Sequence, residues 1–348
     1  MDAEERARLV LAAAGLPPES LAERLPLGGG TYNTVEELRL TDGTRLVLKI
    51  PPPSTVPGLT HERDLLVGEA AYCRAAGTVG VPAPGVVGAA LDESAPTGRH
   101  VLLSHCPGAG WEGLTAERRA GVRRELGGLV ARLHEVTGPG FGYPTGALGS
   151  LASDWRTAFT TMYEAVLDDA RRYAAWLPRP VDEVARTARH AYDALDEVTV
   201  PRLVHFDLWD GNILVEHGAS ARVGGLIDGE RMFWGDPVAD FVSLALLGDI
   251  RQDTDFLAGY QEAGGDPHLS PGAARRYALY RSYLSLIMLV ETVPREADAD
   301  DIAWRRERVA PHLTAALDEL GGAGPGTRVS ADRHEVLARG ARQEGSTP

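Results

Sequence analysis

The densest group of potentially reactive side chains in this chain lies in two stretches, HFDLWDGNILV at 205–215 and GLIDGERMFWGDPVAD at 225–240. Asp207 and Asn212 are five positions apart across a glycine-containing turn, and Asp228 ends the β-prone segment that follows. Proteins bind Mg²⁺ through a few carboxylate or amide oxygens together with the phosphates of a substrate, so Asn212 and Asp228 are suited to that ion. Asp207 is then left to accept a proton from a reacting hydroxyl group.

Aspartate and asparagine beside glycine are also ordinary turn residues, so an isolated D-x-x-x-x-N motif says little. The complete pattern is more specific. It reads H-x-D-x-x-x-x-N and then I-D-G, whose aspartate comes sixteen positions after the asparagine. A glycine cluster at 28–30 and a lysine on a predicted strand precede both motifs. This order favours a phosphate-transfer site over a set of unrelated turns.

Lys49 is the single lysine in a chain with 35 basic residues, and all the others are arginine. A guanidinium is a planar fork, whereas an ammonium is a compact point charge on a flexible stem. A lysine retained only here suggests a site where a forked cation fails, such as a phosphate contact beside a carboxylate. Survival of one lysine by chance is the alternative.

With these motifs the chain resembles the protein-kinase-like antibiotic and metabolite phosphotransferases, over roughly residues 25 to 320. That family includes aminoglycoside phosphotransferases, fructosamine kinases and choline kinases. The resemblance implies an α+β, bilobal protein-kinase-like fold. Its expected parts are a small β-rich N-lobe at 1–106 that covers the nucleotide, a larger and mainly helical C-lobe at 107–320 with the catalytic loop, metal site and acceptor pocket, and a flexible tail at 321–348.

The resemblance also implies roles for individual residues. Asp207 matches the catalytic base, Asn212 and Asp228 match the Mg²⁺ ligands, and the residues expected at the nucleotide are Gly29, Gly30, Thr31, Asn33, Lys49, Glu69, Ser104 and Cys106. Glu69 is expected to pair with Lys49, with Glu62 as the runner-up. Ser104 and Cys106 belong to the expected hinge, whose backbone groups would lie near the purine.

The acceptor side is less defined. Trp209 stands two residues after the expected base, where aminoglycoside phosphotransferases often have histidine and fructosamine-type kinases have tryptophan. Trp209, Glu230 and Trp234 are therefore expected near the acceptor, although a core position is the alternative for both tryptophans. His205 is expected to order the loop, and Asp236 to cap a helix that begins at Pro237.

The elements that must position these residues can be read from apolar periodicity. Two strands joined by Thr41-Asp42-Gly43 place Leu46, Leu48 and Ile50 on one face and Val47 and Lys49 on the other. Further strands are predicted within 81–89 and 99–108, with short β pieces at 203–208, 212–218 and 221–229. Helices are predicted near the N-terminus, over 62–76, after 115, over 152–176 and 181–198, and again after the β pieces to about 320.

Composition limits the class of protein. A 348-residue chain with 44% hydrophobic and 24% charged residues can bury a sizeable core, and it has no apolar run that could span a bilayer. The acidic start favours a cytoplasmic location. Cys73 and Cys106 are expected to be reduced packing residues. The net charge of −14 argues against nucleic acid or an anionic membrane as a partner, and a monomer or weak dimer is expected.

The sequence therefore predicts an enzyme that moves the γ-phosphate of ATP or GTP, with Mg²⁺, to a hydroxyl group of a small molecule. A hydroxylated antibiotic is the first expectation, because 17 Asp and Glu against 7 Arg between Asp207 and Asp301 would attract a cationic acceptor. A kinase of a fructosamine, amino sugar or choline-like metabolite is the alternative. A catalytically dead nucleotide-binding scaffold is a remote one, because the lysine, the base and both metal ligands are all present.

Overall fold

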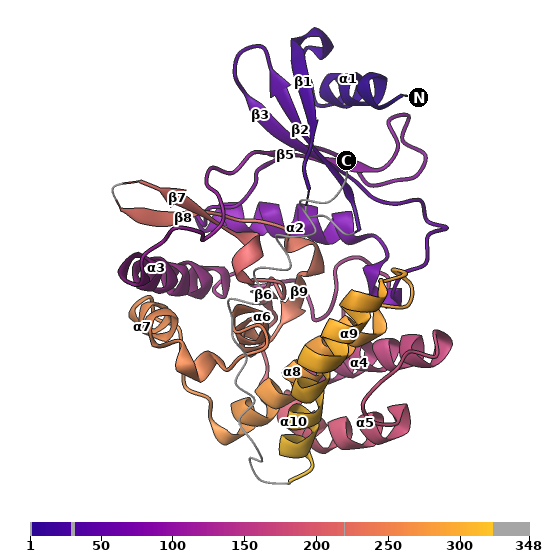
Figure 1. The fold of residues 1–348 in the computed structure, drawn as a ribbon, viewed down its shortest axis with the longest axis vertical. Helices are drawn as coiled ribbons and strands as arrows, with labels where there is room; N and C mark the ends of the chain where they lie inside the picture. The colour runs from indigo at the N-terminus through magenta and orange to yellow at the C-terminus, as the bar shows by residue number, and fades with distance from the viewer. Residues whose placement is uncertain (1, 29–31, 219, 323–348) are drawn as a thin grey trace.

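The computed structural model describes residues 2–28, 32–218 and 220–322, and its N-terminal part is built on one antiparallel sheet. The strands lie in the order β1-β2-β3-β5-β4, with the bounds β1 (Leu21–Pro26), β2 (Thr34–Leu40), β3 (Arg45–Ile50), β4 (Val86–Ala90) and β5 (His100–Ser104). Figure 1 shows the sheet above the helical part of the molecule, with helix α1 (Ala3–Ala13) beside it. The prediction missed β1, because its letters LAERLP combine charged residues with a proline and do not alternate.

The two faces of the sheet differ, as the alternation in β3 predicts. Leu46 and Leu48 lie in a buried cluster with the apolar residues of α1, on the outer face. Val47 and Lys49 point the other way and are paired in register with Leu103 and Val101 of β5. The strand therefore directs its lysine toward α2 beneath the sheet, while its leucines bind the sheet to α1.

The predicted hairpin turn between β2 and β3 is also present. Gly43 has φ +89°, a conformation that residues with a side chain rarely adopt. The carboxylate of Asp42 accepts a hydrogen bond of 2.8 Å from the N–H of Thr44. These two residues fix the register that brings Lys49 opposite Val35.

Helix α2 (Leu65–Thr78) lies between the sheet and the helical part of the molecule (Figure 1). It begins three residues later than predicted, because the residues before it form a separate 3₁₀ turn, η2 (Thr60–Glu62), and Asp64 adopts a left-handed φ of 63°. The helix approaches the C-lobe closely: a Cβ atom at Gly68 would lie 2.5 Å from the carbonyl oxygen of Glu230.

The C-lobe is mainly helical. Its helices are α3 (Ala116–Leu133), α4 (Trp155–Arg172), α5 (Val181–Ala188), α6 (Asp240–Leu244), α7 (Thr254–Glu262), α8 (Pro271–Val290), α9 (Ala299–Arg308) and α10 (Ala310–Leu320). Several starts are capped by side chains, as with Asp154, which accepts 2.8 Å from the N–H of Thr157. The helix predicted over 181–198 is divided into α5 and a 3₁₀ stretch, η3 (Arg189–Glu197).

Two short antiparallel ribbons carry the expected catalytic segments. One joins β6 (Arg202–Val204) to β9 (Phe233–Gly235), and the other joins β7 (Ile213–His217) to β8 (Ala221–Leu226). A small β-rich lobe and a larger, mainly helical lobe thus form the predicted α+β bilobal fold. Among the described residues, no helix has the length and apolar character needed to cross a bilayer.

The hydrophobic core does not divide at the expected lobe boundary of residue 106. Leu66 and Cys73 of α2, together with Val101 and Leu103 of β5, belong to the same buried cluster as the apolar residues of the C-lobe. Only the outer face of the sheet has a separate cluster, shared with α1. Helix α2 is therefore packed as part of the larger lobe.

Candidate active site

Lys49 lies between two carboxylates at the inner face of the sheet. Its Nζ is 3.0 Å from Glu69 Oε2 on α2 and 2.6 Å from Asp228 Oδ1 at the end of the β7-β8 ribbon. Burial alone would lower the pKa of Lys49, but the two carboxylates outweigh it and raise the pKa well above its ordinary value. The lysine is therefore a permanent buried cation that links the two lobes.

The structure pairs Lys49 with Glu69 and not with Glu62. Glu69 lies one turn into α2 and is fully buried. Glu62, in η2, contacts Arg295 and Arg231 of the C-lobe instead. Both glutamates are buried, but the helix places only Glu69 below β3.

The loop from 205 to 212 brings the expected base and one expected metal ligand together. Asn212, in η4 (Asp210–Asn212), donates its amide nitrogen to the backbone carbonyl of Asp207 at 2.9 Å and to Asp207 Oδ2 at 3.1 Å. The Asn212 carbonyl Oδ1 is then the side-chain atom left for a cation. The backbone carbonyl of Asn212 accepts 3.0 Å from the N–H of Ile227, which places the loop next to Asp228.

His205 orders this loop with both of its ring nitrogens and is fully buried, so neither nitrogen is left to exchange a proton with a substrate. Its Nδ1 accepts 3.2 Å from the N–H of Asp207, and its Nε2 donates 3.0 Å to the carbonyl of Ile227. Burial lowers the pKa of His205, in agreement with a neutral ring that accepts at one nitrogen and donates at the other. The sequence assigned His205 this ordering role.

A further acid, Asp240, supports the loop from below. Its carboxylate accepts from the N–H groups of His205 at 3.1 Å and Phe206 at 2.6 Å, and from Nε2 of His134 at 3.0 Å. Phe206 has φ 63°, and the two backbone bonds stabilise that strained turn. The contact of Asp240 with the catalytic loop joins residues more than 30 positions apart and depends on tertiary packing.

The acidic side chains around Asp228 have different protonation preferences. Burial acts to raise the pKa of Asp228, but the Lys49 ammonium outweighs this and lowers it. Burial and the neighbouring Asp228 charge raise the pKa of Glu230 to about 8. Burial also raises the pKa of Asp207 to about 6, while Arg231 acts to lower it. Asp207 and Asp228 are therefore ionised near neutral pH, as a base and a cation ligand require.

One carboxylate oxygen each from Glu69, Asp228 and Glu230 lies within 4.8 Å of the others, around the ammonium group of Lys49. Glu69 pairs with that lysine and Glu230 has a raised pKa, so the hard oxygen donors left for a divalent cation are Asp228 and Oδ1 of Asn212. Asp228 has φ 63° and ψ 45°, a left-handed conformation that turns its carboxylate toward this cluster. Hard oxygen donors of this kind suit Mg²⁺.

The side chains of the expected hinge residues, Ser104 and Cys106, make contacts within the protein. Ser104 is paired in register with Leu46, so its side chain points to the outer face, where its hydroxyl oxygen accepts 2.8 Å from the N–H of Gly85. Cys106 is buried against Gly225, and burial raises the pKa of its thiol to about 11. Any contact of Ser104 with a purine would therefore use its backbone groups. Cys73 and Cys106 are both free and buried, as predicted.

The residues expected beside the acceptor lie in different places. Glu230 is buried, and its Oε2 accepts 2.5 Å from Nδ2 of Asn33, so it lies at the lobe junction near Lys49. Trp209 is partly exposed and covers Gly211. Trp234 is 8% exposed and packs on Gly138, which favours its core interpretation.

Gly29, Gly30 and Thr31, which were expected at the nucleotide, lie outside the described residues. The same holds for residues 323–348 of the expected tail.

Asp236 caps its turn as predicted and also has a second role. Its carboxylate accepts 3.1 Å from the N–H of Val238. It also accepts 2.7 Å from Arg276 and 2.9 Å from the hydroxyl of Tyr280, both on α8. The cap therefore anchors the segment after Asp228 to the longest helix of the lobe.

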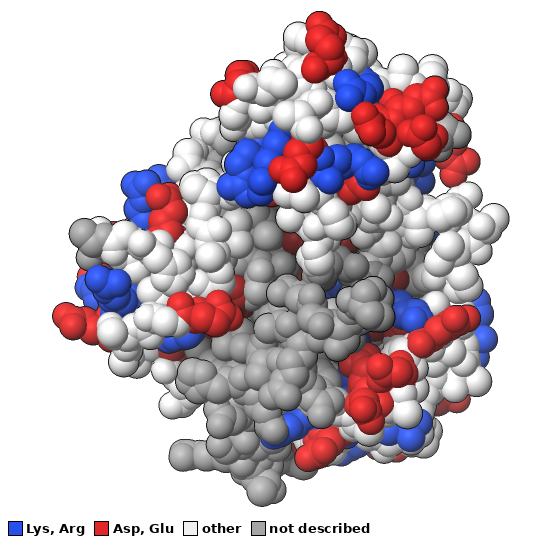
Figure 2. All heavy atoms as spheres, turned by 45° about the horizontal axis from the view of Figure 1, so that its top comes forward, with Lys and Arg blue, Asp and Glu red and all other residues white. Residues whose placement is uncertain are grey.

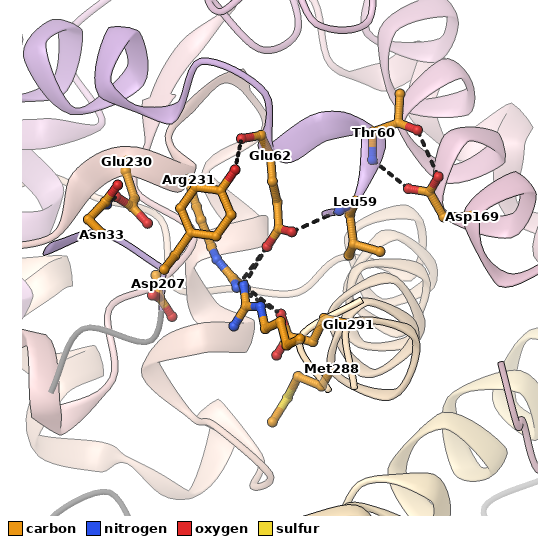
Figure 3. Close-up of polar contacts among 12 residues, drawn as sticks. Asn33, Leu59, Thr60, Glu62, Asp169, Asp207, Glu230, Arg231, Met288 and Glu291 are labelled. Atoms are coloured by element: carbon orange, nitrogen blue, oxygen red, sulfur yellow. Dashed lines mark hydrogen bonds and ion pairs between the residues drawn. The ribbon is translucent and has the colours of Figure 1, made fainter. Parts of the chain in front are cut away.

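The sequence interpretation missed Arg231. This residue lies in η5 (Gly229–Arg231), three positions after Asp228, and it is mostly buried. In Figure 3 its guanidinium lies between the carboxylate of Asp207 and those of Glu62 and Glu291. An arginine three positions after a predicted metal ligand was the available signal, but nothing in the spacing indicated its partners.

The chain is similar to phosphotransferases and kinases in both sequence and fold. The model of the phosphotransferase enzyme family matches residues 23–280. A relative named "Probable ketoamine kinase" from Lactiplantibacillus plantarum is 26% identical over 286 residues, which make up 79% of this chain and 91% of the relative.

Two solved structures share the fold. A "putative fructosamine-3-kinase" from Thermobifida fusca YX-ER1 has a TM-score of 0.64 and 22% identity, covering 91% of this chain and 99% of that one. A thermostable mutant of aminoglycoside phosphotransferase APH(4)-Ia, in ternary complex with AMP-PNP and hygromycin B, has a TM-score of 0.56 and 18% identity, covering 92% and 99%. The family model spans well over half of the sequence, and the chain therefore belongs to the phosphotransferase enzyme family.

Proposed function

We propose that this phosphotransferase uses ATP to phosphorylate a hydroxyl group of a ketoamine or a related amino-sugar metabolite. The arrangement of Asp207 and Asn212 opposite the Lys49–Asp228 ion pair is the observation that carries the proposal. The relative named as a ketoamine kinase supports the metabolite acceptor, and the neighbour bound to AMP-PNP supports an adenine nucleotide. The metabolite acceptor is thereby favoured over the antibiotic that the sequence placed first.

In the proposed mechanism, Asp207 accepts the proton of the acceptor hydroxyl as the hydroxyl oxygen attacks the γ-phosphorus of ATP. The bond between that phosphorus and the bridging oxygen of the β-phosphate breaks, and ADP leaves. Lys49, placed by Glu69, contacts the nucleotide phosphates as a point charge. Asn212 and Asp228 would hold Mg²⁺, which neutralises phosphate charge when it is bound. Phosphoryl transfer of this kind depends chiefly on positioning and electrostatic stabilisation, which these residues supply.

Charge no longer favours a strongly cationic antibiotic. Of the 17 acidic residues between Asp207 and Asp301, nine form ion pairs with arginine or lysine within the chain. These pairs neutralise much of the surface that was expected to attract a cation.

The test is a coupled assay of ADP release on a panel of acceptors, with the Asp207→Asn protein as the blank. The panel contains fructosyl-lysine, free amino sugars, choline and hygromycin B, each with ATP and with GTP. We expect the highest kcat/KM for fructosyl-lysine with ATP. A higher kcat/KM for hygromycin B would reject the ketoamine assignment in favour of an antibiotic acceptor.

A further inference from the structure

Two buried glutamates, Glu62 and Glu291, and two partly exposed arginines, Arg231 and Arg295, form a closed ring beside the catalytic loop. Arg295 Nη2 lies 2.5 Å from Glu62 Oε1 and 3.1 Å from Glu291 Oε2, and Arg231 Nη2 lies 2.9 Å from Glu291 Oε2 and 3.6 Å from Glu62 Oε1. Figure 3 shows Glu62, Arg231 and Glu291 converging from three separate segments. The charges alternate around the ring, so each group has an opposite charge on both sides.

The contacts of Lys49 with Glu69 and Asp228 form what we call the Lys49 bridge. The ring joins the same two segments as this bridge. Glu62 lies in η2 and Glu69 in α2, seven residues further on. Arg231 lies in η5, three residues after Asp228. The Glu62–Arg231 ion pair and the Glu69–Lys49–Asp228 contacts therefore connect the same two parts of the protein. One part is η2 with α2, and the other is the turn that carries Asp228 and Arg231.

The segment that carries Glu62 is fixed to the C-lobe by further contacts. Thr60 donates its N–H at 2.6 Å and its hydroxyl at 2.7 Å to Asp169 of α4. The ring of His61 is stacked on Tyr143, with 5.5 Å between the ring centroids. The carbonyl of Gly58 accepts 2.8 Å from the hydroxyl of Tyr173. Residues 58–62 thus connect β3 to α2 but rest on the larger lobe.

The two bridges differ in what a nucleotide would do to them. The Lys49 bridge uses Asp228, which in the proposed function would hold Mg²⁺, and Lys49, which would contact the nucleotide phosphates, so their mutual contact could be exchanged when nucleotide binds. The ring contains no group with such a role. It can therefore persist while the Lys49–Asp228 contact is exchanged.

We propose that Glu62 is a positioning residue that acts through Arg231. The pair keeps η2 and α2 fixed to η5, so that Glu69 and Asp228 retain their separation while nucleotide enters and leaves. This inference rests on the proposed roles of Lys49 and Asp228. Buried ion pairs add little net stability compared with apolar packing, so the distinctive contribution of the ring is geometric.

The test compares Glu62→Gln with Arg305→Gln. Arg305 contacts Glu291 at 2.6 Å on the outer side of the ring but touches neither Glu62 nor Arg231. Turnover is measured as ADP release from Mg·ATP with fructosyl-lysine, or with water as acceptor if that compound is not a substrate. Failure of the proposed acceptor therefore does not obscure the result.

We expect Glu62→Gln to lower kcat by about tenfold or more, because small misplacements of reacting groups are costly. Metal-free affinity for AMP-PNP should change by less than about twofold, because Lys49 and Glu69 keep their own ion pair when α2 shifts relative to η5. Arg305→Gln should lower the melting temperature yet keep kcat within about twofold of the unmodified protein. The double variant Glu62→Gln/Arg231→Gln should lose no more activity than Arg231→Gln alone, since the two residues act as a unit.

Hydrogen exchange of α2 provides a readout that needs no acceptor. In the unmodified protein, exchange at residues 65–78 should be the same with and without Mg·AMP-PNP, whereas in Glu62→Gln it should depend on the nucleotide. Thr60→Val, which removes one contact to Asp169, serves if Glu62→Gln does not fold and should show the same nucleotide-dependent exchange. The proposal fails if the variant that folds keeps unmodified kcat and nucleotide-independent exchange, or if Arg305→Gln loses as much kcat as Glu62→Gln.

Discussion

At the scale of single residues, three neighbouring acids are distinguished by their partners. Asp228 contacts Lys49 at 2.6 Å, and the lysine lowers its pKa. Burial and the neighbouring Asp228 charge raise the pKa of Glu230 to about 8, although Asn33 donates a hydrogen bond to it. Burial raises the pKa of Asp207 to about 6, although it accepts a hydrogen bond from Asn212. Contact with one cation thus selects Asp228 as the best anionic ligand of the three.

The first residue-scale prediction concerns the base. Asp207→Asn should lower kcat by about 10²-fold, because the acceptor hydroxyl loses its proton acceptor. The fold and the affinity for AMP-PNP should persist, since the amide retains the shape of the side chain. Steady-state kinetics and calorimetry check the two parts, and a variant with more than half of the original turnover would show that Asp207 is not the base.

The second residue-scale prediction concerns the single lysine. Lys49→Arg keeps the charge but places a planar fork between Glu69 and Asp228, in a site that leaves the lysine only 7% exposed. We expect kcat/KM for ATP to fall by about 10²-fold, as a displacement near 1 Å can cause. The measurement is initial rates against ATP concentration at fixed acceptor. Near-normal rates would mean that charge alone suffices at this position.

At the scale of elements, close backbone approach decides how α2 meets η5. A Cβ atom at Gly68 would lie 2.5 Å from the carbonyl oxygen of Glu230, and Gly229 packs under the ring of Tyr72. The hydroxyl of Tyr72 donates 3.4 Å to the carbonyl of Leu226 on β8. Small residues on both sides let the helix lie directly on the turn that follows Asp228.

Alanine substitutions in α2 test this approach with a matched pair. Gly68→Ala should cost about 1–3 kcal/mol of unfolding free energy, because the backbone carbonyl at Glu230 cannot move without shifting η5. Gly77→Ala, in the same helix with nothing within 4 Å of its added Cβ, should gain about 0.5–1 kcal/mol. Urea denaturation measures both. Equal effects at the two positions would refute the close contact.

The η2 turn predicts a pH dependence of stability. Burial lowers the pKa of His61 to about 4 in the folded protein, below its ordinary value of 6.5. As pH falls from 6.5 toward 4 the unfolded chain binds a proton that the folded chain does not, so the unfolding free energy decreases. His61→Phe should make the loss between pH 7 and pH 5 smaller, as measured by urea denaturation. His268→Asn, at an exposed position, is the control that should leave the slope unchanged.

At the scale of the whole molecule, much of the net charge of −14 comes from the segment between Asp207 and Asp301, which has 17 acidic residues and 7 arginines. In the view of Figure 2, acidic and basic side chains are interspersed over the described surface. On the sheet, Glu37 contacts Arg39 at 2.8 Å and Arg45 at 2.5 Å, and these two arginines lower its pKa to about 2. Such pairs weaken any long-range attraction of a cation.

The whole-molecule prediction follows from this pairing. Between low salt and about 0.5 M salt, kcat/KM for the acceptor should change by less than about twofold, because nine of the 17 acidic residues between Asp207 and Asp301 are already paired within the chain. Rates at subsaturating acceptor across a salt series provide the measurement, with the KM for ATP recorded in parallel. A several-fold decrease for the acceptor alone would restore the case for a cationic substrate.

Much of the fold and the core of the candidate site could be predicted because they are encoded over short distances. The period of two in β3 placed Lys49 on the inner face, and the turn chemistry of Asp42-Gly43 set its hairpin. The H-x-D-x-x-x-x-N spacing brought Asp207 and Asn212 into contact within one turn. Each of these features depends on residues only a few positions apart.

Tertiary structure alone decided which distant segments meet. The contact of Glu62 with Arg295 spans 233 positions and that of Asn33 with Glu230 spans 197, and no periodicity in a sequence reports such a pair. For the same reason, the sequence could not exclude Glu62 as the partner of Lys49, which contacts Glu69 in the structure. Nor could it decide between the acceptor and the core for Trp234, which is buried. Local patterns fix which face a side chain occupies, but the partner on that face depends on how the lobes pack, because burial and charge pairing are properties of the assembled core.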